Sequence, residues 1–179
     1  EGANLSVEVM DHAMDPEQAK EWKVRDNGNV ALVMGDKVEL IKLGDKLEHV
    51  KIVYPPVPEK EWSKSREPFG GVERIHIQRG QAKHLPDAVE RLILGFKRGR
   101  LVTLEVRYAR EYSKKRPLHL LVADLSLEYG EPRRQGESYF WWDESTVLVA
   151  SQVLQPHPSG QGEELRSSLS VMDRAYFKP

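Results

Sequence analysis

Two stretches of the chain, 40–58 and 118–132, constrain its fold more than the rest of the sequence. In each stretch, apolar residues recur at helical spacing and are followed by a tyrosine, Tyr54 or Tyr129. Residues that end a helix come next, two prolines in the first stretch and Gly-Glu-Pro in the second. We therefore expect two short helices, each preceded by a strand hairpin and followed by more strand.

The two stretches also predict an internal repeat. Superposing their tyrosines shifts the sequence by 75 residues and aligns Val50 with Leu125, so that the two apolar stripes coincide. The predicted copies cover residues 22–80 and 92–154, and each runs hairpin, helix and strand. The alternative is a chance recurrence, because such patterns are common in chains that mix helices and strands.

Alternation of apolar and polar residues predicts most of the strands. The Asn27-Gly28 pair predicts a tight hairpin turn, since both residues tolerate the backbone that such a turn needs. Residues 55–68 and Tyr112–Arg116 are expected to be loops. The expected strands are Trp22–Arg25, Val30–Met34, Lys37–Lys42, Val72–Gln78, Leu101–Tyr108, Tyr139–Trp142, Thr146–Leu154 and Leu165–Met172.

Helix-start signals complete the predicted elements. Asp45 is expected to cap the first helix of the paired stretches, and Pro117 to begin the second. A short helix is expected from Asp15 to Trp22, because Asp15 can cap it. Gln81–Leu94 predicts a further helix, with a strand over Leu92–Phe96 as the alternative.

These elements predict an α+β fold. We expect an antiparallel β-sheet with helices packed on one face, built from two related βαβ-type halves. The chain has 179 residues, enough to bury a substantial core, and we expect one globular unit over residues 1–179.

Composition excludes several classes of function. Lys and Arg total 27 against 28 for Asp and Glu, so the chain has no long-range field to attract nucleic acid or an anionic membrane. It has no cysteine, which excludes disulfides and thiolate chemistry. No apolar run is long enough to span a membrane within this chain. Because the chain begins at Glu1 rather than Met, we expect an exported, periplasmic or extracytoplasmic protein, with a cytoplasmic one as the alternative.

Motifs for catalysis and metal binding are missing from the sequence. The six histidines show no His-x-His, His-x-x-x-His or His-Glu-x-x-His spacing. No serine stands in a Gly-x-Ser-x-Gly turn, and Gly70-Gly71 precedes a strand rather than a helix, so it forms no phosphate cradle. We expect no catalytic residue, no metal ligand and no cofactor, and hence a protein that is not an enzyme.

The most unusual feature is a run of four aromatic residues, Tyr139, Phe140, Trp141 and Trp142. Along a strand, Tyr139 and Trp141 would lie on one face and Phe140 and Trp142 on the other. One pair can pack against the helices, which leaves the second pair exposed unless another layer covers it. The run is either a strand with two buried faces or a surface for a partner, since exposed Trp and Tyr are enriched at interfaces.

The segments LGDKLEHVKIVYPPVP (43–58) and VADLSLEYGEP (122–132) resemble the helix-to-loop signature of small bacterial envelope domains. The likeness is to the outer-membrane-assembly lipoprotein BamE (SmpA) family and to the tandem β-lactamase-inhibitor-protein fold. In the BamE family the helix ends in Leu-Gly-x-Pro, whereas the first segment here has Pro-Pro. The resemblance implies an envelope-located, protein-binding module and assigns no functional residue.

These observations lead to three functional hypotheses. The first is a non-enzymatic protein-binding or scaffolding module, an accessory subunit of an envelope or membrane-associated complex. The second is a carrier of a small molecule or lipid, with an aromatic-lined pocket near Trp141 or Trp142. The third is a hydrolase with an unrecognised site, which a histidine beside an acid in a pocket would favour.

Overall fold

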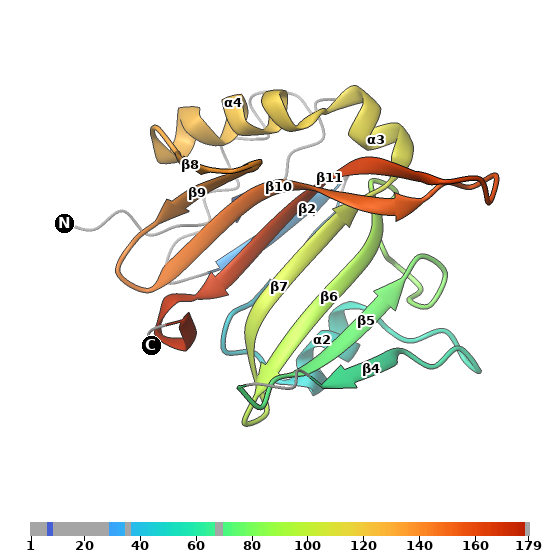
Figure 1. The fold of residues 1–179 in the computed structure, drawn as a ribbon. Helices are drawn as coiled ribbons and strands as arrows, with labels where there is room; N and C mark the ends of the chain where they lie inside the picture. Colours follow the sequence, from blue (N-terminus) through green and yellow to red (C-terminus); the bar gives the residue numbers. More distant parts are fainter. Residues whose placement is uncertain (1–6, 9–28, 35–36, 67–69, 178–179) are drawn as a thin grey trace.

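The computed structural model describes residues 7–8, 29–34, 37–66 and 70–177 (Figure 1). Within these residues an eight-stranded antiparallel sheet dominates, beside a three-stranded sheet and a few short helices. The small sheet consists of β1 (Val7–Glu8), β2 (Asn29–Met34) and β3 (Lys37–Lys42). The strands of the large sheet are β4 (Ser63–Arg66), β5 (Glu73–Gln78), β6 (Val89–Lys97), β7 (Arg100–Tyr108), β8 (Arg133–Gln135), β9 (Ser138–Trp142), β10 (Thr146–Pro156) and β11 (Glu163–Asp173).

Helices make up a minor part of the described chain. They are α2 (Leu47–Val53), α3 (Arg110–Lys115), α4 (Leu118–Tyr129) and the short 3₁₀ helix η1 (Arg174–Phe177). None of the described helices is long and apolar enough to cross a membrane.

This architecture corrects the expected α+β class. The fold is β-rich, with most of its strand residues in one antiparallel sheet. The largest error is the helix predicted over Gln81–Leu94, where the structure has turns followed by the strand β6. Leu92, Ile93 and Leu94 are all buried in succession, so β6 is covered on both sides and has no alternating pattern to distinguish it from a helix.

The order of strands in the large sheet is β4-β5-β6-β7-β11-β10-β9-β8. Each half is therefore a four-stranded meander, and the last strand of one half pairs antiparallel with the last strand of the other. With the helix that precedes it, the first half runs over residues 47–108 and the second over 118–173. The halves are not βαβ units, and these bounds differ from 22–80 and 92–154, so the sequence repeat stays a prediction.

The large sheet has two chemically different faces. Leu104, Val106 and Tyr108 of β7 lie on the inner face, where their side chains are buried. Thr103, Glu105 and Arg107 alternate with them and lie on the outer face. Strand registers extend one inner row from Ile75 of β5 to Trp141 of β9, through Leu94, Leu104, Val171 and Leu148.

Helices α2 and α4 complete the core on the inner side. Val50 of α2 and Tyr54 at its end are fully buried, and Leu121 and Leu125 of α4 join the same apolar cluster. At an apolar transfer free energy of about 25 cal/mol per Å², each such side chain contributes about 2 kcal/mol. The core therefore ties each half of the sheet to the helix that precedes it.

Three local expectations are corrected by the structure. The expected loop 55–68 contains the strand β4. Asp45 does not cap α2, because no side chain caps that helix and Asp45 Oδ2 instead accepts a hydrogen bond from Lys42 N at 2.8 Å. Tyr112–Arg116 is mostly helical rather than a loop, as part of α3. The expected Asp15–Trp22 helix, the Trp22–Arg25 strand and the Asn27-Gly28 turn lie outside the described residues.

Candidate binding surfaces

The four aromatic residues of β9 divide between the two faces of the sheet. Trp141 is 4 % exposed in the core, and its Nε1–H donates to Gly130 O at 2.9 Å, which fixes β9 to the end of α4. Tyr139 packs against the same core. Phe140 and Trp142 lie on the outer face, where Trp142 is 47 % exposed.

A surface hollow of about 400 Å³ adjoins this strand. It lies where the end of α4 meets β8 and β9 and is lined by Tyr129, Glu131, Pro132, Arg133, Phe140, Trp141 and Trp142. Three of the four aromatic residues singled out in the sequence therefore border one concavity. The fourth, Tyr139, lies beneath the guanidinium of Arg134, whose Cζ is 5.7 Å from the ring centroid.

From Phe140 the outer face continues inward with apolar and small residues. Phe140 pairs with Val149, and Trp142 pairs with Val147, on β10. The next position toward the centre of the sheet is Ser170 of β11, which pairs with Val149. An aromatic and aliphatic area on this face thus gives way to a polar centre.

Arginines occupy the outer face of the first half. Arg74, Arg91 and Arg107 come from β5, β6 and β7, and their charges all act on His76. Glu105 offsets part of this charge, because its Oε1 lies 2.6 Å from Arg107 Nε. The first half of the outer face therefore carries an excess of positive charge.

His76 lies among these arginines with Ser65 Oγ 3.0 Å from its Nε2. Burial lowers the pKa of His76 below its ordinary value of 6.5, and the charges of Arg91, Arg107 and Arg74 lower it further. The imidazole is consequently neutral near pH 7, and the arginines alone supply the positive charge of this area.

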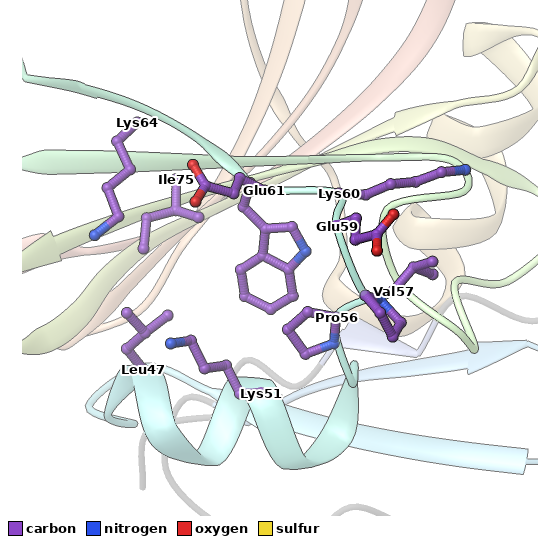
Figure 2. A pocket seen from close by; sticks show the side chains of 11 residues that line it. Leu47, Lys51, Pro56, Val57, Glu59, Lys60, Glu61, Lys64 and Ile75 are labelled. Atoms are coloured by element: carbon purple, nitrogen blue, oxygen red, sulfur yellow. The ribbon is translucent and has the colours of Figure 1, made fainter.

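A larger groove lies on the inner side, between α2 and the β4 edge of the sheet (Figure 2). It has a volume of about 520 Å³, and Leu47, Trp62 and Ile75 give it an apolar surface. Lys51, from α2, and Lys64, from β4, extend into it from opposite walls. This is the size of concave site that proteins use for ligands or for short segments of a partner.

The indole of Trp62 is held in a fixed position within the groove. Its Nε1–H donates to Gln81 O at 3.1 Å. The Gln81 side chain donates in turn to Glu61 O at 2.9 Å and accepts from Gln78 N at 2.8 Å. The turn after β5 therefore fixes the aromatic ring from behind.

A histidine beside an acid occurs at the β10–β11 hairpin, as the hydrolase hypothesis requires. His157 Nδ1 lies 2.7 Å from Ser159 Oγ, and its Nε2 lies 3.9 Å from Glu164 Oε2. However, Arg110 Nη2 lies 3.0 Å from the same Nε2, and arginine can only donate. The Ser159 backbone N–H also donates to Nδ1 at 3.2 Å, so a donor faces each ring nitrogen and the Ser159 contact is a local one within the hairpin turn.

Glu164 joins this cluster as an acceptor for two arginines. Burial alone would raise the pKa of Glu164, but the hydrogen bonds and charges of Arg166 and Arg110 outweigh it and lower that pKa. The ionised carboxylate accepts from Arg166 Nε at 2.9 Å and from Arg110 Nε at 3.0 Å. The cluster holds the hairpin to the start of α3, which accounts for its charges without catalysis.

Metal ligands do not converge in the part of the chain that the structure describes. No group of three or more His, Asp or Glu side chains there is placed to hold an ion. His49 lies 3.6 Å from Asp45, on the exposed side of α2, and His12 is outside the described residues.

No family model, curated protein or solved structure matches the chain. The resemblance to BamE-like envelope domains therefore stays a prediction, and the function has to be inferred from the surfaces themselves.

The sequence indicated the aromatic strand but neither the arginine area nor the groove. The arginines come from three strands, one of which was predicted as a helix, so their convergence depends on the sheet. The groove joins residues of α2, the following loop and β5. The one available signal was Trp62, an isolated tryptophan in a polar, proline-rich segment.

Proposed function

We propose that this protein is a non-enzymatic binding module that uses the outer face of its large sheet to bind another protein. The exposed Trp142 beside Phe140 carries the proposal, because a large aromatic side chain left half in solvent is a typical interface anchor. The arginines at the other end of the same face support it, since Arg is the third residue type enriched in interface hot spots.

The charges indicate the kind of partner. The excess of arginine over glutamate on the first half favours an acidic surface opposite it, while the second half offers an apolar and aromatic area. A partner with an apolar patch beside an acidic one would match both halves. Export and membership of an envelope complex remain predictions from the sequence.

The hypothesis of a small-molecule carrier receives less support at Trp141 and Trp142. The hollow there is at the surface, and the buried Trp141 fills the space beneath it. It therefore provides no enclosed site at this position that would cover an apolar ligand.

The proposal is tested by site-specific photocrosslinking in the native cells. A photoreactive residue replaces Trp142 in one variant and Leu127 in a matched control, because Leu127 is 90 % exposed on α4, away from the outer face. We expect a discrete protein adduct from position 142 and not from position 127. Equal labelling at the two positions would contradict the proposal.

A second variant, Phe140→Ser/Trp142→Ser, separates binding from stability. We expect the crosslinked partner to co-purify with it at least about 10-fold less, the loss typical of an interface hot spot. A thermal unfolding curve shows whether the variant is folded. Unchanged co-purification by a folded double variant would overturn the proposal.

A further inference from the structure

The groove beside Trp62 continues into a second concavity. The second hollow has a volume of about 710 Å³ and runs past Phe96 toward Arg98 and Arg100. Leu47 and Ile75 line both hollows, so the two form one channel between α2 and the β4–β5 edge of the sheet. We call this channel the edge groove. Its length suits an extended chain better than a compact small molecule.

Positive charge predominates along the edge groove. Its lining contains seven lysines and arginines and four glutamates, although the whole chain has a net charge of −1. One of the glutamates, Glu73, is already paired with Lys64 at 3.4 Å. The remaining cations line a groove whose central surface is apolar, and this combination favours an acidic ligand with an apolar anchor.

The wall of the groove is also the free edge of the sheet. β4 is the terminal strand, paired with β5 on one side, and the described residues place no strand on its other side. All four of its residues are exposed. An extended peptide can add to such an edge through main-chain hydrogen bonds, with alternate side chains directed into the adjacent groove.

Lysine and arginine on an edge strand also discourage unwanted self-pairing, and Lys64 and Arg66 would serve that purpose on any exposed edge. Protection of an edge does not require an aromatic ring, however. The fixed Trp62 indole and the apolar surface made by Leu47 and Ile75 supply what a bound side chain needs. A ring held in place before binding also loses little conformational entropy on binding.

We propose that the edge groove binds an extended acidic segment of a partner protein, which pairs with β4 and places an apolar side chain against Trp62. The site is separate from the outer face of the sheet and does not depend on the function proposed for that face. Its ligand is recognised by charge and backbone rather than by a folded surface.

Selection from a displayed library of random dodecapeptides tests the proposal, with the purified full chain as the target. We expect the selected sequences to be enriched in Asp and Glu around an aliphatic or aromatic residue. Affinities of synthetic, fluorescein-labelled copies are then measured by fluorescence anisotropy.

Substitutions in the edge groove test where the selected peptide binds. We expect Lys51→Glu/Lys60→Glu and Trp62→Ser each to weaken binding at least about 10-fold, through charge in the first and the lost anchor in the second. Lys115→Glu is the control for charge, since Lys115 is exposed on α3 outside the groove. Phe140→Ser/Trp142→Ser is the control for the outer face, and both controls should bind normally. Equal loss in Lys115→Glu, or no loss in folded groove variants, would overturn the proposal.

Backbone methylation tests strand addition. Because alternate amides of an added strand point toward the sheet, N-methylation should weaken binding strongly at alternate positions of the peptide and little at the others. If the loss of affinity did not alternate along the peptide, pairing with β4 would be overturned.

Groove-dependent binding of a free fatty acid, without any selected peptide, would overturn the peptide as ligand and assign the groove to a small amphipathic anion.

Discussion

Each half of the large sheet has a tryptophan that bonds a backbone carbonyl, and the two have different surroundings. In the second half Trp141 donates to Gly130 O and is 4 % exposed, inside the core. In the first half Trp62 donates to Gln81 O and lines an open groove. The same hydrogen bond therefore fixes an indole within the core in one half and at the surface in the other.

The helices explain the difference. α4 has 12 residues and buries Leu118, Leu121 and Leu125, whereas α2 has 7 residues and buries Val50 alone within its bounds. The shorter α2 covers less of its half, so Trp62 and the groove lie at its side, although the outermost strand β8 of the second half is exposed as well. The comparison teaches that an indole fixed by the same kind of bond becomes core or surface according to how much of the sheet the neighbouring helix covers.

The largest expected effect is the difference in stability between variants of the two tryptophans. Trp141→Ala should lower the free energy of unfolding by about 3–5 kcal/mol, because it empties a core position. Trp62→Ala should cost less than half of that, since its ring already contacts solvent. Urea unfolding of both variants measures the difference, and equal losses would mean that the groove is part of the core.

A smaller loss of stability is expected from a substitution at Gly95, in a strand pair next to the centre of the large sheet. β10 and β11 pair without interruption, whereas β6 and β7 change register at Gly95. A Cβ at Gly95 would lie 2.2 Å from Thr103 Oγ1 and 3.0 Å from Val72 Cγ1. Gly95→Ala should therefore lower the free energy of unfolding by about 1–3 kcal/mol.

The clash at Gly95 can be separated from other causes. Thr103→Ala removes the nearer atom, so Gly95→Ala should cost less in that background than in the native chain. Thermal or urea unfolding of the four proteins of this cycle gives the coupling. Additive losses would show that the contact with Thr103 is not the source of the cost.

The smallest expected effect is a pH dependence of the free energy of unfolding. It comes from His76, which lies in the first half of the sheet. Because its pKa is lowered in the folded protein, the unfolded chain binds the proton more readily. The free energy of unfolding should therefore rise with pH from the lowered folded pKa up to the unfolded value near 6.5, and fall as the medium is acidified through that window.

His76→Gln should remove this part of the pH dependence, as urea unfolding at a series of pH values would show. His119→Gln is the matched control, because His119 is exposed on α4 and the change leaves His76 in place. A slope that survives His76→Gln would assign the dependence to another group.

Local pattern was enough to predict several elements of the fold. Alternation identified β7 and β9 within a residue or so, because each has one buried and one outer face. Pro117 and Gly130 marked the ends of α4, where Pro117 is the N-cap residue and Gly130 takes a positive φ of 82°. Such signals act within a few residues, so they do not require knowledge of the sheet.

Other features depend on contacts that the sequence does not contain locally. β4 is polar and exposed throughout, and it is a strand because β5 pairs with it. β6 is buried on both sides, so its apolar residues do not alternate with polar ones and the sequence pattern does not identify it as a strand. The edge groove forms where the short α2 lies beside the β4 edge of the sheet. No local sequence pattern predicts that these two segments meet. The aromatic run was found because its four residues are adjacent.

The mirrored strand order also has a consequence for biosynthesis. The first meander can pair internally once β7 has left the ribosome, but the other edge of β7 must wait for β11, where Leu104 finally meets Val171. Until then, that edge of β7, a strand with buried Leu101, Leu104 and Val106, has no partner. A nascent or prematurely terminated chain would present that edge to chaperones or to other copies of itself, so the centre of the finished sheet is open to aggregation during translation.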